Sequence, residues 1–363
     1  MQPPLLFDPL TLVKRPQEWQ SSRNKKVNEF YEKQNEVLYK YHQMLGKLGY
    51  VELTVNEENT RNVDNVKWLI YASTAVTITI VVGLVILAIS SQSLAILAAS
   101  LDAVLDLVSN LILFVTHRLM SQRNLHAYPI GRSRIENIGV ILYASVMSTF
   151  AIQVIVEAIR KFVSIANHED IPLNLGLDPF TLSMLVYVIV VKSILYLVCI
   201  RYASISSSAE TLAMDHRNDL LLNCVGFAMG FAAYYSRQLW LDPLGGVLLS
   251  LFILTSWAKL GLDQIAVVTG KSADIAFINE ITFLVCHFDT LILQIDTVRC
   301  YHLSDKYLVE VDIVLSPDLP LKTAHDVGQH LQDFLEQYPE VERAYVHLDW
   351  EVEHQIEHQF NLK

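Results

Sequence analysis

Cysteine is scarce in this chain, and its four cysteines include no CxxC pair. We therefore predict no disulfide framework, and we expect the thiols to be reduced and buried. Basic residues are too few for a nucleic-acid partner, because the formal net charge is −11 and no basic aromatic motif is present. The sequence also begins without an apolar signal region, since its first long apolar run starts near Leu69.

Charged residues make up only 18% of the chain, whereas hydrophobic residues make up 52%. This balance is too apolar for an ordinary soluble protein and indicates a protein embedded in a lipid membrane. The length of 363 residues suits a membrane domain together with one soluble domain of about 100 residues.

Six segments are predicted to be membrane-spanning helices, since a span needs about 20 mainly apolar residues. They cover residues 69–89, 94–115, 135–159, 180–202, 206–235 and 239–260. The fifth has a polar first half, 206–219, which we expect to line a water-filled cavity. The link between the second and third spans carries four arginines and no acidic residue. It is therefore predicted to be cytosolic, which places both termini in the cytosol.

The pattern changes after about residue 264. Helices are predicted over 273–288 and 321–338, and strands over 293–302, 307–315 and 341–350. The order αββαβ is typical of a small α+β domain with its helices on one face of the sheet. We therefore predict a tail (1–65) with an amphipathic helix, a six-helix membrane domain (66–263), a cytosolic domain (264–353) and a second tail (354–363).

Two acidic patterns with the same spacing lie inside the second and fifth spans. They read Asp102-x3-Asp106-x3-Asn110 and Asp215-x3-Asp219-x3-Asn223. Residues four apart share one face of a helix, about 6 Å from each other along the axis. Carboxylates are costly at membrane depth because they lose their hydration, so two such ladders indicate a site for a cation or for protons.

The oxygen-only character of these ladders favours a hard cation such as manganese over zinc, whose sites usually include nitrogen or sulfur. His216 follows Asp215 but lies about 100° around the helix, so we expect it to point away from the carboxylates. Four close carboxylates cannot all remain ionised without a cation, so protons are expected to occupy the empty site. A metal ion that displaced them would be exchanged for protons if the site faced each side in turn.

Three polar residues near the ladders have two interpretations each. Asn110 and Asn223 are candidate approach ligands, and hydrogen bonding between helices is the alternative. Lys192 lies in the middle of the fourth span, too deep to reach water easily. It is expected either to form a structural ion pair or to balance the charge of the carboxylate cluster.

At these residues the chain resembles the cation diffusion facilitator family, and within it the manganese branch that includes plant metal tolerance proteins. The resemblance runs from about residue 66 to residue 353. Its segments are SLDAVLD (100–106), YPIGRSRIE (128–136), DHRND (215–219), IDTVR (295–299), VEVDIVL (309–315) and VHLD (346–349). Zinc-transporting relatives usually have histidine at the first ligand of the fifth span, where this chain has Asp215.

The resemblance implies a homodimeric exchanger that moves divalent metal out of the cytosol, into a compartment or out of the cell, in exchange for protons. It also implies a ferredoxin-like cytosolic domain that contributes to dimerisation, and residence in a Golgi, prevacuolar or vacuolar membrane. The positions that match a cytosolic metal site of some relatives are Asp296, Asp312, His325, His347 and Asp349. Solvated residues on a sheet face are the alternative for them. A charge pair between the third and sixth spans would join Arg134 to Asp263.

Three other functions are weighed against manganese export, none of which calls for a bound cofactor. The first is export of zinc, or of several divalent metals including iron, cobalt and cadmium, by the same mechanism. The second is a membrane aspartyl protease, but the Tyr-Asp and Gly-x-Gly-Asp pattern of such enzymes is absent around these aspartates. The third is a metal-sensing receptor, and no recognisable signalling domain follows the spans.

Overall fold

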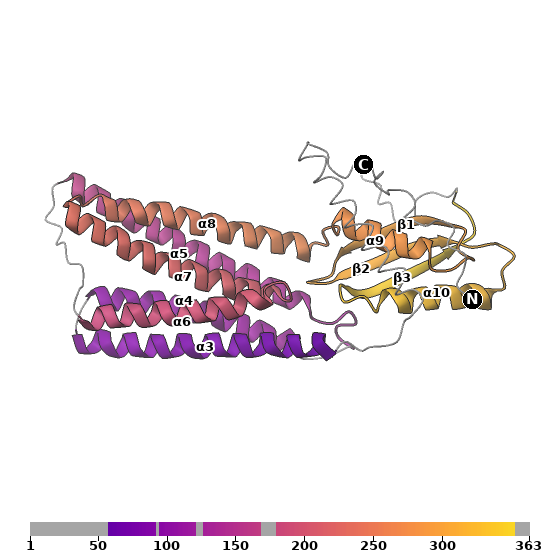
Figure 1. Ribbon diagram of the computed structural model, residues 1–363, viewed down its shortest axis with the longest axis horizontal. Helices are drawn as coiled ribbons and strands as arrows, with labels where there is room; N and C mark the ends of the chain where they lie inside the picture. The colour runs from indigo at the N-terminus through magenta and orange to yellow at the C-terminus, as the bar shows by residue number, and fades with distance from the viewer. Residues whose placement is uncertain (1–56, 92–93, 121–125, 168–178, 353–363) are drawn as a thin grey trace, which may run out of the picture. The chain divides into compact units, whose positions relative to one another are not determined.

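The computed structural model of the chain describes residues 57–91, 94–120, 126–167 and 179–352 (Figure 1). The predicted amphipathic helix and both predicted tails lie outside these ranges, except for residues 57–65. The chain divides into two compact units, one of residues 56–270 with 303–305 and one formed by the rest of the C-terminal part.

The first unit consists of six long helices, and all six predicted spans are helical. They are α3 (Glu57–Ser91), α4 (Leu94–Met120), α5 (Arg134–Ala166), α6 (Pro179–Tyr202), α7 (Ser207–Ser236) and α8 (Leu241–Val268). Five of them are long and apolar enough to cross a membrane. The exception is α7, whose first half carries the polar residues that made the fifth predicted span the least apolar.

The helices of this unit pack mainly in three pairs, α5 with α8, α3 with α4, and α6 with α7. α4 also packs against α5, and they come so close at Gly139 that a Cβ atom there would lie 2.5 Å from Oγ1 of Thr116. Small residues allow such close contacts between membrane helices. α7 contacts α3, α5, α6 and α8, which explains how a polar helix is held inside this bundle.

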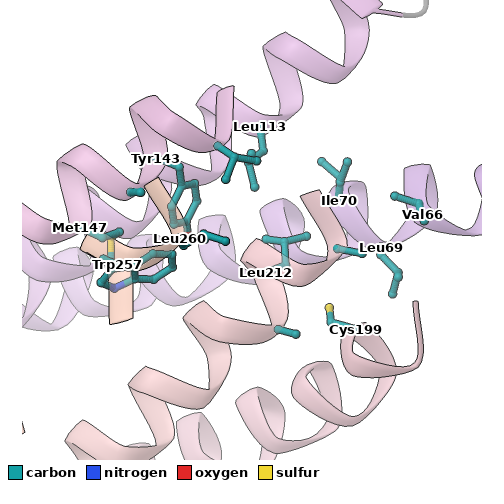
Figure 2. Close-up of a cluster of buried hydrophobic side chains, with 14 of the residues drawn as sticks. Val66, Leu69, Ile70, Leu113, Tyr143, Met147, Cys199, Leu212, Trp257 and Leu260 are labelled. Atoms are coloured by element: carbon teal, nitrogen blue, oxygen red, sulfur yellow. The ribbon is translucent and has the colours of Figure 1, made fainter. Parts of the chain in front are cut away.

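Most of the buried apolar residues of this unit form one cluster (Figure 2). They come from the first halves of α3, α5 and α7 and from the second halves of α4, α6 and α8. We call this cluster the membrane core; its large members include Ile70, Leu113, Tyr143, Met147, Leu212 and Trp257. Within it the rings of Tyr143 and Trp257 are both fully buried, with centroids 5.5 Å apart.

The second unit has the predicted order αββαβ. Its elements are α9 (Ile275–Cys286), β1 (Gln294–His302), β2 (Tyr307–Val314), α10 (Leu321–Leu335) and β3 (Val341–Asp349). The sheet order is β1-β2-β3, with β1 antiparallel and β3 parallel to β2. Both helices contribute to one core with the strands, from Ile281 and Leu284 on α9 and from Leu331 and Leu335 on α10. The prediction of a small α+β domain is therefore confirmed.

Candidate metal site

The ammonium group of Lys192, on α6, lies among carboxylates from two other helices. Its Nζ atom is 3.6 Å from Oδ2 of Asp106 on α4 and 3.9 Å from Oδ2 of Asp215 on α7. It also forms an ion pair and hydrogen bond with Oδ2 of Asp219, one turn further along α7. The acidic patterns of α4 and α7 thus face each other, with a cation between them.

Three of the four predicted carboxylates meet at this point. The fourth, Asp102, lies on α4 one turn before Asp106, and its side chain is outside the described part of the structure. Asp215 is fully buried and Asp219 is 9% exposed, whereas the side chain of Asp106 is 22% exposed. The arrangement is a deep carboxylate cluster that has one more accessible side, at Asp106.

Asp215 has few good partners for its charge. Its contacts with Lys192 Nζ and with Nδ1 of His216 are each 3.9 Å, which is longer than a hydrogen bond. The Tyr143 side chain, from α5, also lies beside it. Since a buried carboxylate is costly unless it is paired or coordinated, Asp215 is well suited to accept a metal ion or a proton.

His216 lies beside the carboxylates, so the prediction that it points away from them is wrong. Its ring is fully buried, and one ring nitrogen lies within 4.8 Å of carboxylate oxygens of both Asp215 and Asp219. Among the residues that the structure describes, Asp215, His216 and Asp219 form the one group of histidine, cysteine or acidic side chains whose ligand atoms are close enough together to hold a metal ion. The position of His216 around α7 does not by itself fix where the ring lies. A hydrogen bond between its Nε2 and Oγ of Ser73 on α3, at 3.2 Å, also holds the ring.

The two asparagines have different surroundings. Asn110 is almost fully buried, and its side-chain nitrogen donates a hydrogen bond to Oγ1 of Thr77 on α3, at 2.9 Å. This is the helix–helix contact considered as the alternative to metal binding. Asn223 lines a cavity next to Asp219 and donates to the Asp219 main-chain carbonyl at 2.7 Å. Asn223 is therefore the better placed of the two as an approach ligand.

A cavity of about 760 Å³ reaches the carboxylate cluster from the half of the bundle away from the membrane core. Asp106, Lys192 and Asp219 form its polar end. The rest of its wall comes from the second halves of α3, α5 and α7 and the first halves of α4 and α6, which are mostly apolar there. The cluster thus has a cavity on one side along the helices and tightly packed side chains on the other.

The polar first half of α7 does not line this cavity, contrary to the prediction from the sequence. From Ser207 to Asp219 most of its side chains are buried inside the helical unit, and only Asp219 reaches the cavity. In this half of α7, polar groups of the protein take the place that the sequence predicted for water. Glu136, buried on α5, accepts hydrogen bonds from the Ser206 hydroxyl and from the Ser208 amide at the start of α7. A carboxylate at a helix N-terminus satisfies otherwise unpaired amides and interacts favourably with the helix dipole.

The predicted charge pair between Arg134 and Asp263 does not form among the described residues. Both side chains are exposed, so neither needs a protein partner. The same ends of α5 and α8 are joined instead by buried amides, since Asn137 donates to Oε1 of Gln264 at 2.8 Å. A neutral hydrogen bond thus replaces the predicted ion pair at this helix contact.

The residues predicted for a cytosolic metal site are only partly brought together. Nδ1 of His347, on β3, is 3.7 Å from Oδ1 of Asp312 on β2 and 3.9 Å from Oδ2 of Asp349. His325 is exposed on α10 and lies beside its neighbour Asp326, with Nδ1 3.4 Å from the Asp326 carboxylate. Asp312 accepts a hydrogen bond from Thr297 on β1, next to Asp296. Three of the five positions therefore share one end of the β2–β3 pair.

Two buried residues near the site were not among those predicted. The sequence predicts neither the burial of His216 beside the carboxylates nor the hydrogen bonds of Glu136 at the start of α7. A signal for both was present, because each is a polar residue inside a predicted span. The sequence does not show which residues on other helices they contact.

Comparison with known proteins gives consistent matches across the helical unit. A family model described as the cation efflux transmembrane domain matches residues 70–267. Metal tolerance protein 7 of Oryza sativa subsp. japonica is 34% identical over 340 residues, which are 93% of this chain and 85% of that protein. Metal tolerance protein 10 of Arabidopsis thaliana is 35% identical over 342 residues, covering 93% and 78% respectively. Metal tolerance protein 4 of rice is 37% identical over 274 residues, covering 74% and 67%.

Proposed function

Because this chain belongs to the cation diffusion facilitator family and is a divalent-cation efflux transporter rather than an enzyme, we propose that it exports manganese from the cytosol in exchange for protons. One observation carries the proposal: the carboxylates of α4 and α7 converge on a single buried cation, Lys192. A site that already holds one positive charge among three carboxylates has the chemistry to hold a metal ion. Asp102 is proposed as the fourth ligand.

Proton exchange follows from the electrostatics of that site. Lys192 balances only one of these negative charges, and carboxylates this close cannot all stay ionised when no metal is bound, so protons are taken up when the metal leaves. A divalent metal that enters displaces them. If protons are supplied on one side and metal on the other, the proton gradient drives the metal gradient without a separate proton site.

We propose that the cavity of the helical unit faces away from the cytosol. The loop with the excess arginines leads into α5, and the predicted cytosolic side is therefore the side of the membrane core. The cavity then lies on the opposite, non-cytosolic side. We propose that this conformation is the one that releases metal away from the cytosol, and that opening between the core residues admits metal from the cytosol.

Reconstituted vesicles test this function. With an acidic lumen as the proton source, purified protein in proteoliposomes is expected to take up manganese as protons leave, and uptake should stop when an ionophore collapses the pH gradient. Protein-free liposomes under the same gradient serve as the control. Uptake that continues unchanged after the gradient is removed would contradict proton coupling, although metal transport itself would stand.

A second candidate is export of zinc, or of several divalent metals including iron, cobalt and cadmium. The observation that favours it is the His216 ring nitrogen within 4.8 Å of the Asp215 and Asp219 carboxylates, because zinc prefers sites with nitrogen ligands. We favour manganese because carboxylates supply most of the ligand atoms.

Changing Asp215 to histidine is expected to shift selectivity toward zinc. The substitution adds a nitrogen ligand and removes one hard oxygen donor, so the ratio of zinc to manganese transport should rise by about tenfold. Initial uptake rates of both metals in proteoliposomes measure the ratio. His216→Ala is the matched variant, since it removes the neighbouring nitrogen and should lower the same ratio. An unchanged ratio in Asp215→His would remove the argument for manganese.

We propose that the protein is a homodimer in which the ferredoxin-like α+β unit contributes to association, and that it resides in a Golgi, prevacuolar or vacuolar membrane. A regulatory metal ion bound by Asp312, His347 and Asp349 belongs to the same proposal, and it is supported by their proximity at the end of the β2–β3 pair. Asp296 and His325 are weaker candidates for it.

A further inference from the structure

We propose that Lys192 is a tethered counter-ion that occupies the carboxylate site between transport cycles and competes with the transported metal ion. The inference rests on the proposed function, because it assigns a role to a residue at the same carboxylates. It differs from a charge-balancing role in one respect: the ammonium group and the metal ion occupy the same position among the carboxylates, so only one of them can be there at a time. Lys192 then sets the affinity of the site and assists release.

Lys192 is surrounded by more carboxylates than a structural ion pair requires. A single carboxylate is enough for such a pair, as the contact between Lys161 on α5 and Asp242 on α8 illustrates. Lys192 is 96% buried, and its nitrogen lies within 4 Å of three carboxylates from two helices. Charges are retained in such a place only when they are well paired, so the cluster is organised around this nitrogen.

The ammonium group and a metal ion would compete for the same oxygen atoms. In each of Asp106, Asp215 and Asp219 the oxygen nearest to Lys192 is Oδ2, so all three point at one position. A divalent cation coordinated by these oxygens would be only a few ångströms from the ammonium charge, where repulsion in a buried site is large. The metal can therefore bind fully only after the lysine side chain has moved aside.

Lys192 has space into which it can move. Its side chain lines the cavity of about 760 Å³ together with Asp106 and Asp219. Its four-carbon stem is flexible, and the cavity has room for the ammonium group to leave the carboxylates. When the lysine returns to the carboxylates it replaces the metal charge with its own, which lowers the cost of releasing the metal into the cavity.

Lys192→Met tests the proposal, because methionine has a similar volume and no charge. Equilibrium binding of manganese to the purified variant should be tighter than in the wild type by about tenfold or more. Transport at saturating manganese should be slower, because release loses its competitor. Lys161→Met, which removes the exposed lysine paired with Asp242, is the matched control and should change neither quantity.

Several outcomes decide the matter. Manganese binding that is weaker or unchanged in Lys192→Met would overturn the proposal and leave Lys192 as a structural partner. If Lys192→Met unfolds without metal, manganese binding and folding are also measured for Lys192→Gln. Folding that is restored by added manganese supports the proposal, because the metal then takes the place of the ammonium group among the carboxylates. Failure of manganese to rescue either variant overturns it. Measurements on the wild-type protein distinguish failure of the proposed function from failure of the competition proposal. Wild-type protein that neither binds nor transports manganese contradicts the proposed function.

Discussion

Replacing Asp219 with asparagine is expected to abolish metal transport. Asparagine keeps the shape of the side chain but removes a buried charge that pairs with Lys192 and lines the cavity. The site loses one ligand, and the lysine loses its nearest partner. Removing one member of a buried, hydrogen-bonded charge pair costs about 2–5 kcal/mol in binding, so transport should fall by about thirtyfold to several thousandfold. Initial rates of manganese uptake in proteoliposomes measure the effect.

The control for this variant is Asp242→Asn. Asp242 is also an aspartate paired with a lysine, Lys161, but the pair is exposed and lies away from the carboxylate cluster. Such surface pairs contribute little, so uptake should stay close to the wild-type rate. Asp219→Asn protein that is folded and transports at a rate similar to that of Asp242→Asn would show that the α7 carboxylate is not a transport ligand.

Replacing Trp257 with alanine is expected to cause the largest loss of stability. Trp257 is fully buried in the membrane core and packs against Tyr143, which lies on α5 near Asp215. Removing the indole leaves a cavity that the surrounding helices fill only in part. The free energy of unfolding should fall by about 3–5 kcal/mol, which thermal melting of the purified protein in detergent will register as a lower Tm.

Trp240→Ala provides a matched comparison at the start of the same helix. Trp240 immediately precedes α8 and is 45% exposed, so its removal leaves no enclosed cavity. Its effect on Tm should be small. A Trp257→Ala variant as stable as Trp240→Ala would contradict the description of this half of the bundle as a tightly packed seal between the metal site and the predicted cytosolic side.

The fold was largely predictable because its signals are local. Apolar runs identified six helices, and alternating patterns located each strand of the second unit at or next to its observed first residue. The polar half of α7 was the exception. Its hydrophilic residues predicted contact with water, whereas Glu136 and Ser73 supply protein partners for it. Partners on other helices depend on tertiary packing, which a local pattern does not contain.

The site shows the same division between local and tertiary information. The i,i+4 spacing correctly placed Asp215 and Asp219 on one side of α7, and the depth of Lys192 predicted an ion pair or charge balance with carboxylates. The spacing gave no information on the rotation of α6, which decides that Lys192 meets carboxylates of both α4 and α7. It also misdirected the prediction for His216, because a helical angle fixes the start of a side chain and not the neighbour that holds its ring.

The central claim is that the α4 and α7 carboxylates bind the metal in exchange for protons, and counting protons tests it most directly. Manganese is added to the purified transporter in weakly buffered detergent solution, and the metal bound and the protons released are measured together. The claim predicts that wild-type protein releases protons as manganese binds, and that the Asp106→Asn and Asp219→Asn double variant loses both signals. Manganese binding without proton release, or equal binding by the double variant, would contradict it.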